Sequence, residues 1–130
     1  MHKSYTIAQL KDIQDILGDY PGDMKPLKDP LTTTQVALTY RRMPAKTGAK
    51  GSYGHRHHTQ EEIIFVFTGK VQVKVDNDVV ELGPKSAIRI APGAIQGTWN
   101  EGPADAEILI ISNRMEPEDQ VDKIDGFWPA

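Results

Sequence analysis

The sequence predicts an all-β domain, built as a sandwich or a barrel. Short segments of alternating apolar and polar residues fill positions 32–112, and Gly, Pro, Asn or Asp interrupts them about every ten residues. Strands of four to eight residues between regular turn signals are typical of antiparallel sandwiches and barrels. The segment leaves no room for the helical crossovers that a parallel sheet needs. We therefore expect one antiparallel β domain.

Residues 1–31 are expected to form an N-terminal arm of the same domain, partly helical and partly extended. Gly18 and Pro21 would end a helix, and Pro26 and Pro30 should keep the following chain extended. Apolar residues recur at helical spacing in the first half of the arm: Ile7, Leu10, Ile13 and Leu17.

The barrel itself is expected to span residues 32–112. Residues 62–68 are apolar on both faces, which predicts a strand that is covered on both sides. The run Asp76-Asn77-Asp78 has turn chemistry, so the segments on either side should form a hairpin. The predicted strands are 32–42, 62–68, 70–75, 79–82, 86–90, 94–99 and 106–112. Residues 113–130, with apolar residues near their end, should form a tail that packs on the barrel.

Composition and charge exclude several classes of function. The 130 residues are enough for one domain, and they contain no cysteine, so thiolate metal sites and cysteine nucleophiles are excluded. The formal net charge is -3 and no basic stripe is present, which argues against a nucleic-acid partner. No apolar run approaches the length of a membrane span or a signal peptide. We expect a cytoplasmic protein that binds neither nucleic acid nor membranes.

A cluster of histidines carries the strongest chemical signal. His55 and His57 are two positions apart, so their side chains share one face of an extended chain. Two imidazoles on one strand form half of a site for Zn, Fe, Ni or Cu. His58 has the opposite parity and is expected beside the ligands rather than among them. Glu61 and Glu62 point to opposite faces, so one of them shares the face of Ile64 and Val66.

The segment GHRHHTQEEIIFVFTG resembles the first cupin motif. In that motif His-x-His is followed by three or four residues, then Glu, then six residues and Gly. Four residues after His57 lead to Glu62, and six more lead to Gly69. The resemblance therefore implies a jelly-roll barrel, also called a double-stranded β-helix, with Glu62 as the third ligand. Glu61 is then expected at the surface or paired with Arg56.

The segment GPKSAIRIAPGAIQGTWN resembles the second cupin motif only in part. Gly93 and Asn100 match it, whereas Gln96 stands where the motif has its fourth metal-binding histidine. Lys85 and Ala91 replace a Gly and a Pro of the motif. The resemblance implies a metal held by His55, His57 and Glu62, with the amide oxygen of Gln96 as a weaker fourth ligand.

The resemblance implies a small cupin that binds one divalent transition metal and acts on a small polar molecule. The metal would be Fe, Mn, Ni or Zn, and the reaction would be of the dioxygenase or isomerase type. The alternative is a metal-free, non-catalytic module that binds a small molecule, which the substitution at Gln96 favours.

Strand positions also suggest residues of a substrate pocket and a dimer interface. The candidate pocket residues are Tyr40, Tyr53, Arg89 and Trp99, with core packing as the alternative for the aromatic residues and solvent as the alternative for Arg89. The outer face of segment 62–68 carries Ile63, Phe65 and Phe67. Because cupins of this size are commonly homodimers, we expect this face to contribute to a homodimer interface.

Overall fold

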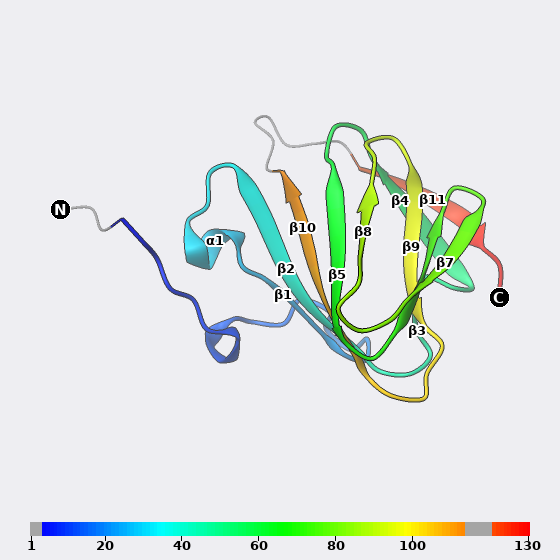
Figure 1. Ribbon diagram of the computed structural model, residues 1–130, viewed down its shortest axis with the longest axis horizontal. Helices are drawn as coiled ribbons and strands as arrows, with labels where there is room; N and C mark the ends of the chain where they lie inside the picture. The colour runs from blue at the N-terminus through cyan, green and yellow to red at the C-terminus, as the bar shows by residue number, and fades with distance from the viewer. Residues whose placement is uncertain (1–3, 114–120) are drawn as a thin grey trace.

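A computed structural model describes residues 4–113 and 121–130 of the chain. Two antiparallel sheets lie face to face, which confirms the all-β prediction (Figure 1). One sheet has the order β1-β2-β10-β5-β8, the other has the order β11-β4-β9-β6-β7, and the short strand β3 also pairs with β9. The strands are β1 (Asp23–Pro26), β2 (Val36–Met43), β3 (Thr47–Gly48), β4 (Ser52–His57), β5 (Glu62–Thr68), β6 (Val71–Val75), β7 (Asp78–Leu82), β8 (Ala87–Ile90), β9 (Ile95–Asn100), β10 (Ala106–Asn113) and β11 (Val121–Trp128).

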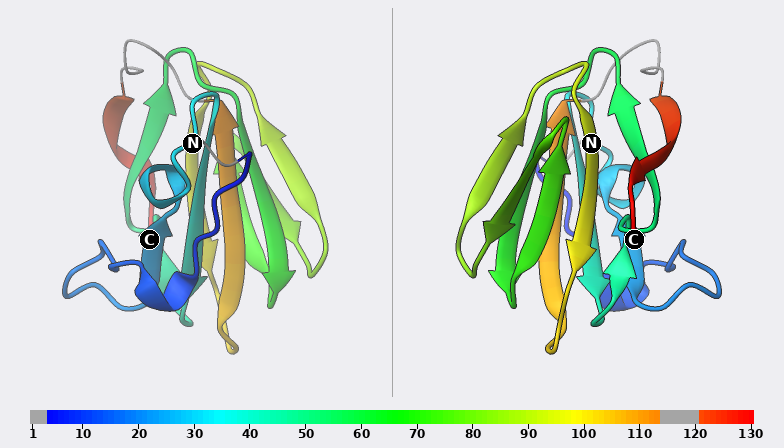
Figure 2. Two further views of the ribbon diagram at one scale, coloured as in Figure 1. Left: turned by 90° about the vertical axis from the view of Figure 1, so that its left-hand side faces the viewer. Right: turned by 90° about the vertical axis from the view of Figure 1, so that its right-hand side faces the viewer.

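All seven predicted strands are present, with their ends shifted by a few residues. The turn between β6 and β7 forms the predicted hairpin, in which Val75 pairs with Asp78. Four strands lie outside the seven predicted segments: β1, β3, β4 and β11. Strand β1 lies at the edge of the five-stranded sheet, and β11, drawn in red in Figure 2, lies at the edge of the six-stranded sheet.

The helix expected from the apolar spacing of residues 7–17 is wrong. The described part of the N-terminal arm has only a three-residue 3₁₀ turn, Leu10–Asp12, and the one-turn helix α1, Lys28–Leu31, which contains Pro30. A short helix needs tertiary packing, yet Ile7 is 75% exposed. The carboxylate of Asp15 instead accepts hydrogen bonds from the backbone N–H groups of Leu17 and Met24, which holds the chain in a local turn. No helix among the described residues has the length and hydrophobicity needed to cross a bilayer.

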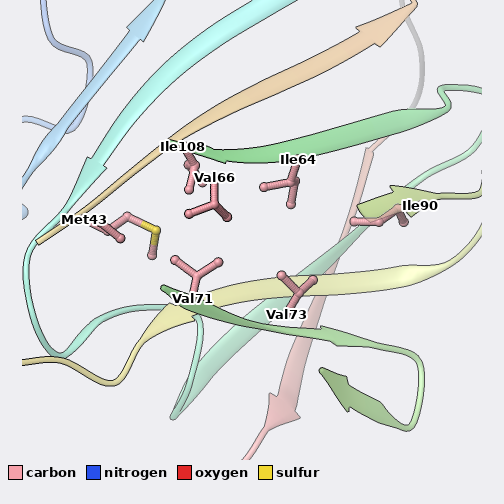
Figure 3. Packing of buried hydrophobic residues seen from close by; sticks show 8 residues of the cluster. Met43, Ile64, Val66, Val71, Val73, Ile90 and Ile108 are labelled. Carbon is pink, nitrogen blue, oxygen red and sulfur yellow. The ribbon is translucent and has the colours of Figure 1, made fainter. Parts of the chain in front are cut away.

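The hydrophobic core lies between the two sheets (Figure 3). Side chains from β5 and β6 point toward each other across this space, and those of β2, β8 and β10 close it at the sides. Its members are almost fully buried: Met43, Ile64, Val66, Val71, Val73, Ile90, Ala106 and Ile108. Strand alternation then decides which other side chains enter the barrel interior.

Strand β2 turns Leu38 and Tyr40 outward, whereas Met43 at its end enters the core. Arg41 pairs with Ile108, which belongs to the core, so Arg41 lies on the inner face of the sheet. Tyr40 pairs with Leu109 on the outer face, and Leu109 in turn pairs with Phe65 of β5. The outer face of this sheet is therefore also apolar, and the alternation in β2 does not by itself identify the buried side.

Strand β11 packs closely against the outside of β4. A side-chain Cβ placed at Gly54 would lie 2.4 Å from Cδ2 of Phe127 on β11. The absence of a side chain at Gly54 therefore gives the C-terminal strand its close approach. The ladder runs from the pair Val121–His57 to the pair Trp128–Ser52, so β11 supports the strand that carries the two histidines.

Candidate metal centre

Three side chains that could hold a metal ion meet inside the barrel. His55 and His57 come from β4, and Glu62 is the first residue of β5. One ligand atom from each residue lies within 4.8 Å of those of the other two. Nε2 of His57 is 3.2 Å from Oε2 of Glu62, and the two imidazole rings are perpendicular, with centroids 5.0 Å apart.

Local strand geometry explains this convergence. Along β4 the side chains alternate, so His55 and His57 face the interior while Arg56 between them faces outward to Asp122. Along β5 the carboxylate of Glu62 shares the inner face with Ile64, and Glu62 is only 6% exposed. A single turn between the two strands therefore brings the histidine pair and the carboxylate together.

Burial keeps His55 in the form that binds metals. Desolvation lowers the pKa of His55 below its ordinary value, the carboxylate of Glu62 partly opposes this shift, and the charges of His57 and Arg41 add to it. The neutral imidazole therefore predominates at neutral pH. Neutral imidazole is the form of histidine that ligates a metal ion.

The donor set fits one transition-metal ion. Ligand atoms that bind one ion at about 2.0–2.2 Å lie roughly 3–4 Å from one another. The His57–Glu62 distance of 3.2 Å already satisfies this condition, and the 4.8 Å limit on the whole group leaves only a small side-chain adjustment. Two imidazoles and one carboxylate are the facial set typical of non-haem iron, and the same atoms also suit Mn, Ni and Zn.

Gln96 lies next to this group. It is 2% exposed and belongs to β9, where its Cα is paired with that of His55. Side chains of directly paired residues in antiparallel strands lie on the same face, with Cβ atoms about 4.5–5.5 Å apart. The position implied by the second motif therefore faces the same interior as the histidines, and its amide remains the predicted weaker ligand.

Ion pairs around the centre differ from the expected ones. Glu61 pairs with Arg89 on β8 rather than with Arg56. Arg56 binds Asp122 of β11 at 2.6 Å, and Nε2 of His58 lies 2.8 Å from the same carboxylate oxygen. Both neighbours lower the pKa of Asp122, so this carboxylate stays charged and ties β11 to the ligand-bearing strand.

The structure does not bring all four candidate pocket residues to the centre. Tyr40 donates a hydrogen bond of 2.5 Å to Glu107 on the outer face. Arg89 lies at the surface with Glu61, and the indole of Trp99 donates to Glu101. Tyr53 has the same parity on β4 as His55 and His57, and it is 47% exposed. Only Tyr53 of the four shares a strand face with the histidines.

Sequence reasoning missed Arg41 as a residue of this interior. Its charge contributes to the lowered pKa of His55, so the two side chains are close enough to interact electrostatically. The clue in the sequence was the spacing of two between Arg41 and Met43, since residues two apart in a strand share one face. Met43 is fully buried, so Arg41 faces the interior as well. The more obvious apolar alternation of Val36, Leu38 and Tyr40 indicated the other face.

Comparison with known proteins identifies the family. The family described as "Cupin domain" matches residues 42–112, more than half of the chain. The chain belongs to the cupin family. The match includes all three candidate ligands and Gln96. No curated protein sequence matches the chain.

Several solved structures share the fold over most of this chain. A cupin protein from Bacteroides fragilis is 22% identical with a TM-score of 0.70, and the match covers 86% of each chain. A polyketide cyclase from Streptomyces resistomycificus is 19% identical with a TM-score of 0.73, covering 98% of this chain and 87% of the other. A cupin-superfamily sugar phosphate isomerase from Silicibacter pomeroyi is 18% identical with a TM-score of 0.70, covering 94% of each chain. These similarities confirm the jelly-roll barrel.

Proposed function

We propose that this cupin binds one divalent transition-metal ion through His55, His57 and Glu62, with Gln96 as a weaker fourth ligand, and acts on a small polar molecule. The observation that carries the proposal is the convergence of two imidazoles and one carboxylate within 4.8 Å on inner strand faces. Three protein ligands leave coordination positions open, as catalytic metal sites require. The bound ion would supply Lewis-acid or redox chemistry to a molecule that occupies those positions.

The reaction we propose is of the isomerase or dioxygenase type. The protein would orient its ligands through the β4 ladder and exclude water with the apolar side chains of Ile64 and Ile90, each 1% exposed, of which Ile90 is paired with Glu62. Two similar structures are described as a sugar phosphate isomerase and a polyketide cyclase. They support a small, oxygen-bearing substrate for this chain.

The test is metal binding to the untagged protein, with and without its histidine pair. The parent chain should bind about one equivalent of a divalent transition metal, and the variant His55→Ala/His57→Ala should bind none, because a lone carboxylate holds such ions poorly. Elemental analysis after reconstitution and desalting gives the stoichiometry. His58→Ala is the matched control, since His58 faces Asp122 instead of the interior, and this variant should keep its metal. One equivalent of metal in the double variant would refute the ligand assignment.

A metal-free binding module is the second candidate, and one contact favours it. The 3.2 Å distance between His57 and Glu62 allows these side chains to satisfy each other without an ion. In that case the parent chain would take up no metal after reconstitution. It would still be stabilised against heat by a small ligand, since any molecule that binds only the folded state raises the unfolding temperature.

A homodimer is proposed from the outer face of the five-stranded sheet. Ile63 and Phe67 of β5 are 39% and 44% exposed, and the ring of Phe67 stacks edge-on against Phe65. A contiguous apolar face of this kind is typical of an association surface.

Light scattering coupled to size exclusion tests the dimer. The parent chain should elute with twice the 14.4 kDa mass of one chain, and Phe67→Glu should shift it to the monomer. The control is Val79→Glu, because Val79 is 51% exposed on β7 in the other sheet. A monomeric parent at micromolar concentration would contradict the proposal.

A further inference from the structure

Arg41 is an arginine that faces the interior of the barrel. It lies on β2 between Met24 of β1 and Ile108 of β10, to which its Cα is paired. Ile108 and the neighbouring inner residue Met43 are both 0% exposed. The side chain of Arg41 therefore leaves the sheet on the side of the core, while that of Arg42 leaves on the outer side.

The guanidinium of Arg41 has no counter-ion among the described residues. Its Nε is buried and makes no hydrogen bond within residues 4–113 and 121–130. Arg42 on the same strand, by contrast, forms two ion pairs. Its Nε lies 2.7 Å from Asp23, and its Nη1 lies 3.0 Å from Asp105. Two adjacent arginines thus differ completely in their partners, and the one that faces the core, with its Nε buried, is the one without a carboxylate.

An arginine without a counter-ion on the inner face lowers the stability of the folded chain when no ligand is bound. Transfer of a charged group out of water is unfavourable unless a partner of opposite charge or a set of hydrogen bonds replaces the water. Burial accordingly lowers the pKa of Arg41, and the only groups that oppose this shift are the phenols of Tyr20 and Tyr53. No carboxylate among the described residues pairs with Arg41, which leaves the buried Nε available to an anion from outside the described chain.

The position of Arg41 relative to the metal centre indicates where that partner would sit. The charge of Arg41 influences the pKa of His55, and the phenol of Tyr53 on the same face of β4 influences Arg41. The guanidinium therefore faces the same interior as the histidines from the β2 side and lies within electrostatic range of His55. A molecule that reaches the open coordination positions would also come within range of its donors.

We propose that Arg41 binds an oxyanion of the substrate, either a carboxylate or a phosphate group, next to the metal centre. The planar guanidinium offers parallel N–H donors that match both groups, and such bonds are the stronger, charge-assisted kind. The substrate would then be a small anionic molecule held at two points, by Arg41 and by the metal. Attachment to the metal rests on the proposed function, whereas binding of the oxyanion by Arg41 requires no metal.

The test uses the full chain after metal removal with a chelator. Inorganic phosphate and malonate are titrated separately, at constant ionic strength set with sodium chloride, and binding is followed by the unfolding temperature and by calorimetry. The parent chain should be stabilised by at least one of the two anions. Arg41→Met should bind that anion at least about tenfold more weakly, since the charge-assisted hydrogen bonds are lost. A response to malonate alone would indicate a carboxylate substrate, and a response to phosphate alone a phosphorylated one.

Two further variants separate binding from a structural role. Arg42→Met should keep the full anion response although it loses the ion pairs with Asp23 and Asp105. Without anion, Arg41→Met should unfold at the same or a higher temperature than the parent, because the buried charge has gone. Arg41→Lys keeps the charge without the planar donor pair, so it should show an intermediate affinity. A parent without any anion response, or equal responses in the parent and Arg41→Met, would overturn the proposal.

The same experiment remains informative if the proposed metal site fails. An Arg41-dependent anion response in a parent chain that binds no metal would refute the metal centre and leave the oxyanion site intact. A metal-binding parent without the response would refute only the oxyanion site. The variant His55→Ala/His57→Ala, titrated with the same two anions, should retain the response, since it leaves Arg41 in place.

Discussion

The variant Gln96→His should bind a divalent transition metal at least about tenfold more tightly than the parent chain. An imidazole is a much better ligand for Fe, Ni or Zn than an amide oxygen. Mutation of residues that only hydrogen-bond to the ligands already changes metal affinity about 10–100-fold. The addition of a ligand should change the affinity by at least as much. Competition with a chromophoric chelator measures the dissociation constants of the parent and the variant side by side.

The fold should accept this substitution without rearrangement. Glutamine and histidine have similar volumes, and Gln96 is already 2% exposed on the inner face of β9. Its Cα is paired with that of His55, so the side chain of a histidine at position 96 would lie beside that of His55 on the same face. Above the pKa values of the histidines the gain should be complete, and it should fall as protons compete for the imidazoles at acid pH.

Gln72→His is the matched control. Gln72 lies on β6 of the same sheet but pairs with Trp99 on its outer side, so a histidine there adds a surface ligand only. This variant should bind the metal with the parent's affinity. If Gln96→His shows no gain over Gln72→His, the side chain at position 96 does not reach the ion and the four-residue ligand set is wrong.

The sequence was sufficient for the barrel because its strands are separated by strong turn signals. Glycine, proline and the Asp76-Asn77-Asp78 turn mark the strand ends, and these local preferences agree with the final fold. The convergence of the metal-binding side chains was also predictable. The two-residue spacing of His55 and His57 fixes their common face, and the spacing of the cupin motif selects Glu62, which the structure places on the inner face with Ile64.

The remaining features depend on tertiary contacts that alternation does not encode. Arg41 could not be placed because both faces of the five-stranded sheet are apolar, so the pattern of Leu38 and Tyr40 was equally consistent with either orientation. Strand β11 escaped prediction since its sequence is largely polar, and its pairing depends on the close approach of Phe127 to Gly54. The N-terminal periodicity failed for a related reason, because no surface of the barrel buries Ile7.

Asn100→Ala should lower the free energy of unfolding by about 2–4 kcal/mol, the largest effect expected of any single polar substitution in the barrel. Asn100 is 1% exposed at the end of β9. Its amide donates to the carbonyl oxygens of Met43 and Ala104, each at 2.8 Å, and its Oδ1 accepts from the N–H of Gly102 at 2.8 Å. Removal of the side chain leaves these backbone groups without partners, and a buried unsatisfied group costs about 1–3 kcal/mol.

The measurement is urea denaturation at equilibrium, with Asn77→Ala as the control. Asn77 lies exposed in the turn between β6 and β7, so its replacement should change the unfolding free energy by less than about 0.5 kcal/mol. The two asparagines therefore separate the loss of buried hydrogen bonds from the general effect of an Asn→Ala change. Because Asn100 joins the end of β9 to Met43 at the end of β2, it also fixes the two strands that carry Gln96 and Arg41. A loss below about 1 kcal/mol would show that water replaces these bonds, and that the ends of the two strands are not held together by this side chain.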